Sequence, residues 1–266
     1  GYIQDGKSYN SFGIIIDDDI FDEVAPDPKD FTPVFVTSET FDGNHHHAWT
    51  TELERAPNGD IVTLFTTRFG TELGGSGTHP GAADHRIFYG RFDGTTWTNT
   101  ELAKMGGPLY SSEQDYTGLG AIHPDDPSTV YISTPFHPTD DSPLIHHEIF
   151  KGTTGDNGLT WTWKQVTIDS GVDNFRPAIA KWNSKNTAVF WLRGTYNTSQ
   201  NYDQALVGLV ETDGEDTGDI TYVDATSTNT TLANGSALTT SGPDAGDGSD
   251  DDLWHESSAF GNGGSV

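Results

Sequence analysis

The sequence has no cysteine and few basic residues: 13 Lys and Arg stand against 40 Asp and Glu, for a net charge of -27 over 266 residues. Without cysteine, neither disulfide bonds nor thiol chemistry is available. Non-specific binding to nucleic acid or to an anionic membrane surface is excluded, because both need Lys and Arg to neutralise phosphates. No run of about 18 apolar residues is present, so no membrane-spanning helix is expected.

The acidic residues are spread along the chain from Asp5 to Asp252. A surface of this kind keeps a protein soluble, and halophilic proteins use it as well. We therefore expect a secreted or extracellular-surface protein. Two interpretations stay open, a halophilic protein from a salty habitat and an ordinary acidic extracellular protein.

Helical periodicity is almost absent, and short β-prone runs separated by Gly, Asp, Asn and Pro dominate instead. One pattern recurs. Residues 84–90 (DHRIFYG), followed by an Asp-Gly turn and Thr-Trp, are repeated at 146–152 (HHEIFKG) and more weakly at 203–208 (DQALVG). The offset is about 60 residues, and self-similarity at such a period indicates an array or a propeller.

Each repeat divides into four strands, which is the blade of a β-propeller. The strands are expected at about 47–55, 61–67, 86–92 and 96–103, then 116–122, 129–134, 147–153 and 160–167, then 175–182, 187–193, 204–211 and 219–225. The predicted fold is all-β: a propeller of four-stranded antiparallel blades, with about three complete blades and part of another. Either the ring is completed by a longer chain, or several chains assemble to close it.

The expected organisation has three parts. Residues 1–44 are the end of a preceding blade and a connection, and 45–225 are three blades, at about 45–107, 115–170 and 174–225. Residues 226–266 are an acidic linker rich in Gly, Ser and Thr, or the start of a further element.

Antiparallel alternation puts the starts of the first and third strands of each blade at one end, together with the end of the second strand. Most of the scarce His and Arg residues, and several Tyr, fall at these positions. Loops at one end of a rigid scaffold are where binding sites are usually built. The alternative is structural: His and Arg near a propeller axis also satisfy buried carbonyls or acids, and the Trp residues are expected in the core.

Residues 154–161 (TGDNGLTW) resemble the Asp-box of BNR repeats, in which Asp accepts hydrogen bonds across a hairpin, Gly takes a positive φ and Trp packs between sheets. A longer pattern is formed by 44–50 (NHHHAWT), 84–92 (DHRIFYGRF), 115–119 (DYTGL), 130–134 (VYIST), 147–152 (HEIFKG), 173–177 (DNFRP) and 192–196 (LRGTY). On these segments, the chain resembles the BNR-repeat family of secreted carbohydrate-active propellers over residues 1–225. It is similar to propeller polysaccharide lyases such as ulvan lyases and rhamnose–glucuronate lyases.

The resemblance implies cleavage of a uronate-containing polysaccharide by β-elimination, and we expect no cofactor. Such a reaction needs a cation on the carboxylate, a base for the neighbouring proton and an acid for the leaving oxygen. Arg suits the first role because its planar fork binds carboxylates. The candidates are Arg176 or Arg193 for the carboxylate, His85 or His147 as base, and Tyr116 or Tyr196 as acid; His47, Arg68, His137, His146 and Tyr202 are candidate substrate-binding residues.

Two other functions are weighed. A sialidase-like glycosidase needs three Arg and carboxyl partners, for which Arg68, Arg176 and Arg193 are available, with Glu72, Glu113 and Glu148 near the same end. A non-catalytic carbohydrate-binding or surface-assembly subunit, which self-associates through open sheet edges, is the second alternative.

No metal is expected, although two weaker alternatives exist. His45 and His47 point to the same side of a strand, and with His85 they form a candidate zinc site. Residues 244–252 (DAGDGSDDD) have the composition of a calcium loop without its ordered spacing, and a solvated acidic tail is the preferred interpretation.

Overall fold

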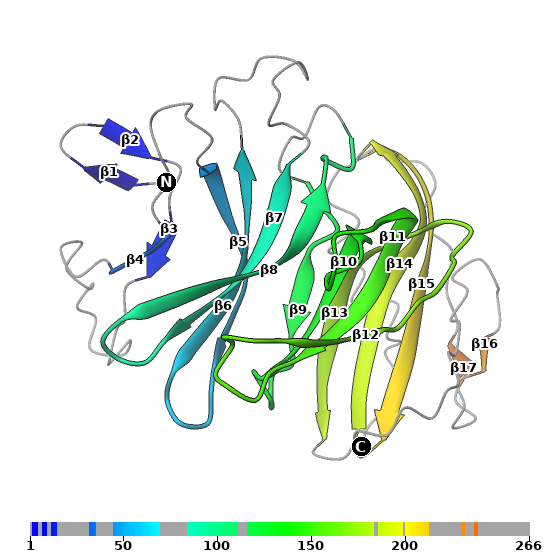
Figure 1. Cartoon of the computed structure of the whole chain (residues 1–266). Helices are drawn as coiled ribbons and strands as arrows, with labels where there is room; N and C mark the ends of the chain where they lie inside the picture. The colour runs from blue at the N-terminus through cyan, green and yellow to red at the C-terminus, as the bar shows by residue number, and fades with distance from the viewer. Residues whose placement is uncertain are drawn as a thin grey trace.

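A computed structural model of the chain describes residues 2–4, 7–9, 12–14, 32–35, 45–69, 84–110, 116–183, 186–198, 200–212, 230–231 and 237–238. In this described part every regular element is a β-strand, and the larger sheets follow one another along the chain (Figure 1). No helix long and apolar enough to cross a membrane occurs among these residues.

The first sheet has four antiparallel strands in sequence order. They are β5 (His45–Arg55), β6 (Ile61–Phe69), β7 (His85–Phe92) and β8 (Trp97–Gly106). The second sheet has the same order, with β9 (Gly120–Ile122), β10 (Thr129–Phe136), β11 (Pro143–Thr153) and β12 (Thr162–Gln165). These positions confirm the strands that the repeat predicts for the first two blades.

The third sheet contains β13 (Asp173–Asn183), β14 (Asn186–Thr198) and β15 (Asn201–Thr212), again antiparallel and in sequence order. The fourth strand expected at 219–225 lies outside the described residues. Three successive antiparallel sheets with this order confirm the predicted fold class, an all-β chain of propeller blades that does not close a ring within the described residues.

Smaller strand pairs flank these sheets. β1 (Tyr2–Gln4) pairs with β2 (Lys7–Tyr9), β3 (Phe12–Ile14) with β4 (Thr32–Phe35), and β16 (Thr230–Thr231) with β17 (Ala237–Leu238). The β3–β4 pair packs on the first sheet, where Val34 and Phe35 meet the stacked rings of Phe65 and Phe88. The division at residues 44 and 225 stays a prediction.

The core explains why the central strands are apolar on both faces. On β10, Val130 and Ile132 join the cluster shared with the first sheet, whereas Tyr131 between them joins the cluster shared with the third. All three side chains are fully buried. Successive side chains of a strand point to opposite faces. A sheet packed on both sides therefore has a continuous apolar run such as VYI (130–132), because each face meets a neighbouring blade.

The hairpin between β11 and β12 forms the hydrogen bonds that its motif predicts. Asp156 accepts hydrogen bonds from the Thr160 amide (2.8 Å) and hydroxyl (2.6 Å) and from the Thr154 hydroxyl (2.8 Å). These bonds, led by that of the Thr160 hydroxyl, lower the pKa of Asp156 to about 2. The Trp161 ring packs edge-on against Tyr89 of the first sheet. The β11–β12 turn therefore packs against the first sheet as well as joining two strands of the second.

Candidate functional site

The strand pairings bring the predicted residues to one end of each sheet, here called the site end. In the first sheet, His47 on β5 pairs with Arg68 on β6, which pairs with His85 on β7. In the third sheet, Asn174 on β13 pairs with Arg193 on β14. The opposite end, called the turn end, contains the Asp-Gly hairpins.

Arg176 lies in a β-bulge at the site end. Phe175 pairs with Leu192 and Ala178 with Phe190, so β13 has one extra residue there, beside Pro177, which has no N–H to donate. Arg176 has a φ of +51°, an uncommon conformation for a residue with a side chain, and its amide donates to the carbonyl of Gly118 (2.7 Å). A bulge of this kind changes the direction in which the side chain of the bulged residue points.

The Arg176 guanidinium lies against aromatic rings. Its central carbon is 4.9 Å from the ring centre of Tyr116 and 5.7 Å from that of Tyr196. Tyr110 completes the group, 6.1 Å from the Tyr116 ring and 5.5 Å from the Tyr196 ring between centres. Each contact of this kind contributes about 0.5–2 kcal/mol, depending on how far the pair is desolvated. Among the described residues, no carboxylate forms an ion pair with Arg176.

The cluster of Tyr110, Tyr116, Arg176 and Tyr196 brings together three of the residues proposed from sequence. Sequence reasoning missed Tyr110, because it follows the end of β8 and does not begin or end a predicted strand. The amide of Leu109 donates to the carbonyl of Tyr116 (2.8 Å) and closes the β8–β9 connection. The closure places Tyr110 beside Tyr116, and two tyrosines flanking a short connection were the only available signal.

His147 is held by Asp173. Its amide donates to an Asp173 carboxylate oxygen (2.8 Å), and its Nδ1 lies 3.4 Å from the same oxygen, as does Nδ1 of His146. Burial would raise the pKa of Asp173, but the hydrogen bonds and charge of His147 outweigh it and lower the pKa below its usual value. Nε2 of His147 is buried without a hydrogen-bond partner, and the ring packs on Phe175.

Asn174 connects the second and third sheets. Its side-chain oxygen Oδ1 accepts from the indole N–H of Trp191 (2.9 Å). Its side-chain nitrogen Nδ2 donates to Ser170 Oγ (3.0 Å) and to Glu148 (3.3 Å). Glu148 also accepts from the amide and hydroxyl of Ser170 (2.7 and 2.8 Å) and from the Thr167 hydroxyl. A buried carboxylate with this many donors is well satisfied, so Glu148 has a structural environment.

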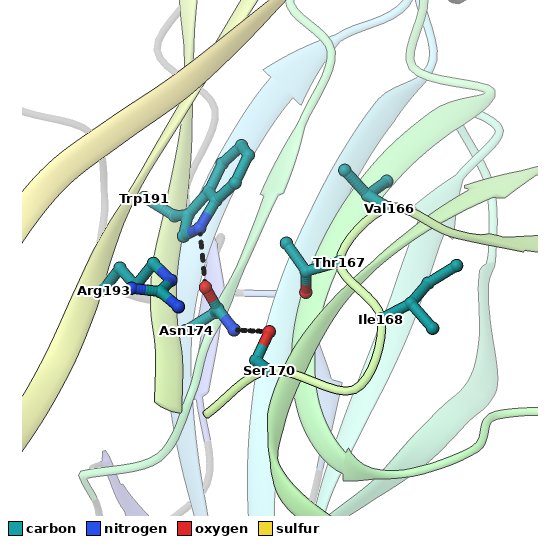
Figure 2. Close-up of a pocket in the computed structure, with 7 residues that line it drawn as sticks. All are labelled: Val166, Thr167, Ile168, Ser170, Asn174, Trp191 and Arg193. Atoms are coloured by element: carbon teal, nitrogen blue, oxygen red, sulfur yellow. Dashed lines mark hydrogen bonds between the residues drawn. The ribbon is translucent and has the colours of Figure 1, made fainter. Parts of the chain in front are cut away.

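A pocket of about 220 Å³ opens beside this network (Figure 2). The β12–β13 connection forms one wall, and β13 and β14 supply the residues of the other. The lining residues are Val166, Thr167, Ile168, Ser170, Asn174, Trp191 and Arg193. Arg193, proposed from sequence, is the only ionisable residue among them, whereas Arg176 belongs to the tyrosine cluster.

Other predicted residues have structural surroundings. His85 is 1% exposed, and its Nδ1 lies 3.0 Å from the carbonyl of Gly106, as the structural alternative expects. Arg68 is buried, and the His137 ring packs on Phe150. Tyr202 is exposed and pairs with Tyr196 on the neighbouring strand. The side chain of His47 lies outside the described part, as do Glu72 and Glu113. The functional roles of all these residues stay predictions.

No group of three His, Asp or Glu able to hold a metal is found among the described residues. The two metal alternatives are not tested by this, because the side chains of His45 and His47 and the acidic segment 244–252 lie outside that part.

No family model matches the sequence, and no curated protein matches it. The similar solved structures include an α-L-arabinanase of Penicillium chrysogenum complexed with arabinobiose (14% identity, TM-score 0.43) and two structures of α-L-arabinofuranosidase from Fusarium graminearum. Of these two, one is a GH93 enzyme with arabinobiose (12%, 0.42) and the other a mutant with an iminosugar inhibitor (13%, 0.41). Each match covers 79% of this chain and 58% of the solved chain. A likeness of this size assigns neither substrate nor reaction.

Proposed function

We propose that the chain is part of a secreted carbohydrate-active propeller that binds acidic sugar units at the site end. The observation that carries the proposal is the Arg176 guanidinium held against the rings of Tyr116 and Tyr196. A guanidinium binds a carboxylate through two parallel hydrogen bonds, and phenol groups beside it supply further donors. In a chain with a net charge of -27, a cation without a carboxylate partner among the described residues is well suited to take one from a ligand.

The same residues support β-elimination of a 4-linked uronate. A base removes the proton on the carbon next to the carboxylate, the electron pair forms the new double bond, and the 4-linked oxygen leaves with a proton from an acid. Arg176 neutralises the carboxylate. Of the predicted bases, His85 is buried and His147 has an enclosed Nε2, so we assign the proton transfers to Tyr116 and Tyr196.

Glycoside hydrolysis is the second candidate, and it is the activity class of the similar solved structures. On this chain the observation that favours it is a chain of hydrogen bonds that links two carboxylates, Asp173 and the structurally held Glu148. The Asn174 amide donates both to Glu148 and to the carbonyl of His147, whose own amide donates to Asp173. Most glycoside hydrolases use a pair of carboxyl groups.

The test uses oligosaccharides of uronic acids and, as neutral ligands, arabino-oligosaccharides such as arabinobiose. It is run at about 1 M salt, where the Debye length of about 3 Å screens repulsion between the acidic protein and a polyanion. We expect the uronate ligands to bind more tightly, and Arg176→Ala to weaken that binding at least about tenfold, because a charge-assisted pair is lost.

Arg55→Ala is the matched control, because it removes an exposed arginine at the turn end with the same change in net charge. Equal uronate binding by the two variants would contradict the proposal. The reaction is decided by the product: an unsaturated uronate absorbs ultraviolet light, whereas hydrolysis gives new reducing ends without that absorbance.

A further inference from the structure

The pocket between the second and third sheets has two chemically different sides. In Figure 2, Trp191 and Arg193 lie on one side, and Val166, Thr167 and Ile168 lie on the other. Its volume, about 220 Å³, is below the range of about 300–1,000 Å³ typical of sites for drug-sized ligands. The space therefore suits a single sugar ring and not a longer chain.

The buried Glu148 fixes the direction in which the hydroxyl groups of two pocket residues, Thr167 and Ser170, point. The hydroxyls of Thr167 and Ser170 both donate their only proton to Glu148. A hydroxyl has one proton and two lone pairs, so these two side chains have only acceptor capacity left. Each already accepts one bond, Thr167 from the Ile149 amide and Ser170 from Asn174. One lone pair on each oxygen remains for a ligand that brings its own donors.

Arg193 has the opposite character, since a guanidinium only donates. A ligand that fits both sides must donate toward Ser170 or Thr167 and accept from Arg193. A sugar hydroxyl does both, whereas a carboxylate only accepts and would face the lone pairs and the charge of Glu148. The apolar surface of Val166 and Ile168 suits the C–H groups of the ring.

We propose that this pocket binds one neutral sugar ring, whose hydroxyl groups donate to Ser170 or Thr167 and accept from Arg193. The inference rests on the proposed function for the ligand being a carbohydrate, and it adds a site for an uncharged unit distinct from the Arg176 cluster. A glycan that carries both acidic and neutral units is the substrate class that fits the two sites.

The test measures binding of neutral pentoses and hexoses (L-arabinose, D-xylose, D-glucose and D-galactose) and of D-glucuronate by ligand-observed NMR. Ile168→Trp is the blocking variant, because Ile168 lines the pocket and is 66% exposed, so a larger ring narrows the opening without disturbing the core. Leu159→Trp is the matched control; Leu159 is 59% exposed in the β11–β12 turn at the other end.

We expect at least one neutral sugar to bind the unaltered chain. Ile168→Trp should weaken the binding of this sugar about tenfold or more, and Leu159→Trp should leave its binding unchanged. Arg193→Met should also weaken the binding of this sugar, because it removes the guanidinium donors and keeps most of the side-chain volume. The inference is overturned if no neutral sugar binds, or if Ile168→Trp binds it as well as Leu159→Trp.

The variant Arg176→Ala separates the two proposals. It should retain the binding of the neutral monosaccharide and lose that of uronate oligosaccharides. If uronates bind through Arg176 but the pocket takes no neutral sugar, the pocket inference fails and the proposed function stands. If neutral sugars bind in the pocket and Arg176→Ala has no effect on uronates, the Arg176 proposal fails alone.

Discussion

The two ends of the same sheets are built from polar groups used in opposite ways. In the Asp-Gly hairpins of the turn end, hydrogen-bond partners are close in sequence: Asp93 accepts from the amides of Thr95 and Thr96, two and three residues away. At the site end, partners are far apart, since Ser133 donates to the carbonyl of Asn174 across 41 positions and His147 to Asp173 across 26. The hydrogen bonds of an Asp-Gly hairpin need only that hairpin, whereas those of Ser133 and His147 need the second and third sheets packed together.

Asn174→Leu should have the largest effect on stability. It leaves the buried Trp191 N–H without its acceptor and removes a donor from the buried Glu148. Each unsatisfied buried group costs about 1–3 kcal/mol, more when charged, so we expect a loss of about 4 kcal/mol in the free energy of unfolding. Urea denaturation measures it.

Asn58→Leu is the turn-end counterpart, because Asn58 is exposed and accepts only from the amide of Asp60. We expect the free energy of unfolding to fall by about 0.5 kcal/mol, as for most surface substitutions. Equal losses in the free energy of unfolding for Asn174→Leu and Asn58→Leu would contradict the proposed difference between the two ends.

Two glycines at the turn end should differ in how much stability is lost when each is replaced by alanine. Gly158 and Gly94 have φ values of +89° and +94°, which a side chain rarely adopts. A Cβ on Gly158 would stand 2.5 Å from the Tyr89 ring of the first sheet, whereas one on Gly94 meets nothing within 4 Å. Alanine at Gly94 should cost about 1 kcal/mol from the backbone alone, and alanine at Gly158 about 3 kcal/mol, because overpacking is added.

Thermal or urea unfolding of the two alanine variants measures this difference. Similar losses in the free energy of unfolding would mean that the contact between the β11–β12 turn and Tyr89 does not contribute to stability, and that Tyr89 moves aside without cost.

The smallest effect is expected from Asp156→Asn, and it depends on pH. The pKa of Asp156 is about 2 in the folded chain against a usual value of 3.8. A lowered pKa stabilises the fold fully above the unfolded value, and this contribution is lost as the pH falls through the folded one. The unaltered chain should therefore lose more stability than Asp156→Asn between pH 4 and pH 2.

Melting temperatures over that range test the prediction. Asp93→Asn is the comparison, because the pKa of Asp93 is also lowered, mainly by the Thr96 amide. Parallel pH profiles for Asp156→Asn and the unaltered chain would show that the turn does not depend on the charged form.

Much of the fold was predictable because its signals are local. The alternation and turns around residues 61–67 and 129–134 predict β6 and β10, and the structure places strands at Ile61–Phe69 and Thr129–Phe136. The site was less predictable. Tyr116, Arg176 and Tyr196 were proposed and do meet, but Tyr110 was missed. His85, one of the two predicted bases, is buried beside a backbone carbonyl, and its role in a reaction stays a prediction.

The sequence by itself determined the strands, their order within each blade and the aspartate-rich hairpins, because these depend on side-chain alternation and on hydrogen bonds between residues close in the chain. Only the tertiary structure decided which polar residues meet. The bulge at Arg176 and the packing of the third sheet on the second are products of long-range contacts, and they turn one arginine toward two tyrosines and another toward a pocket.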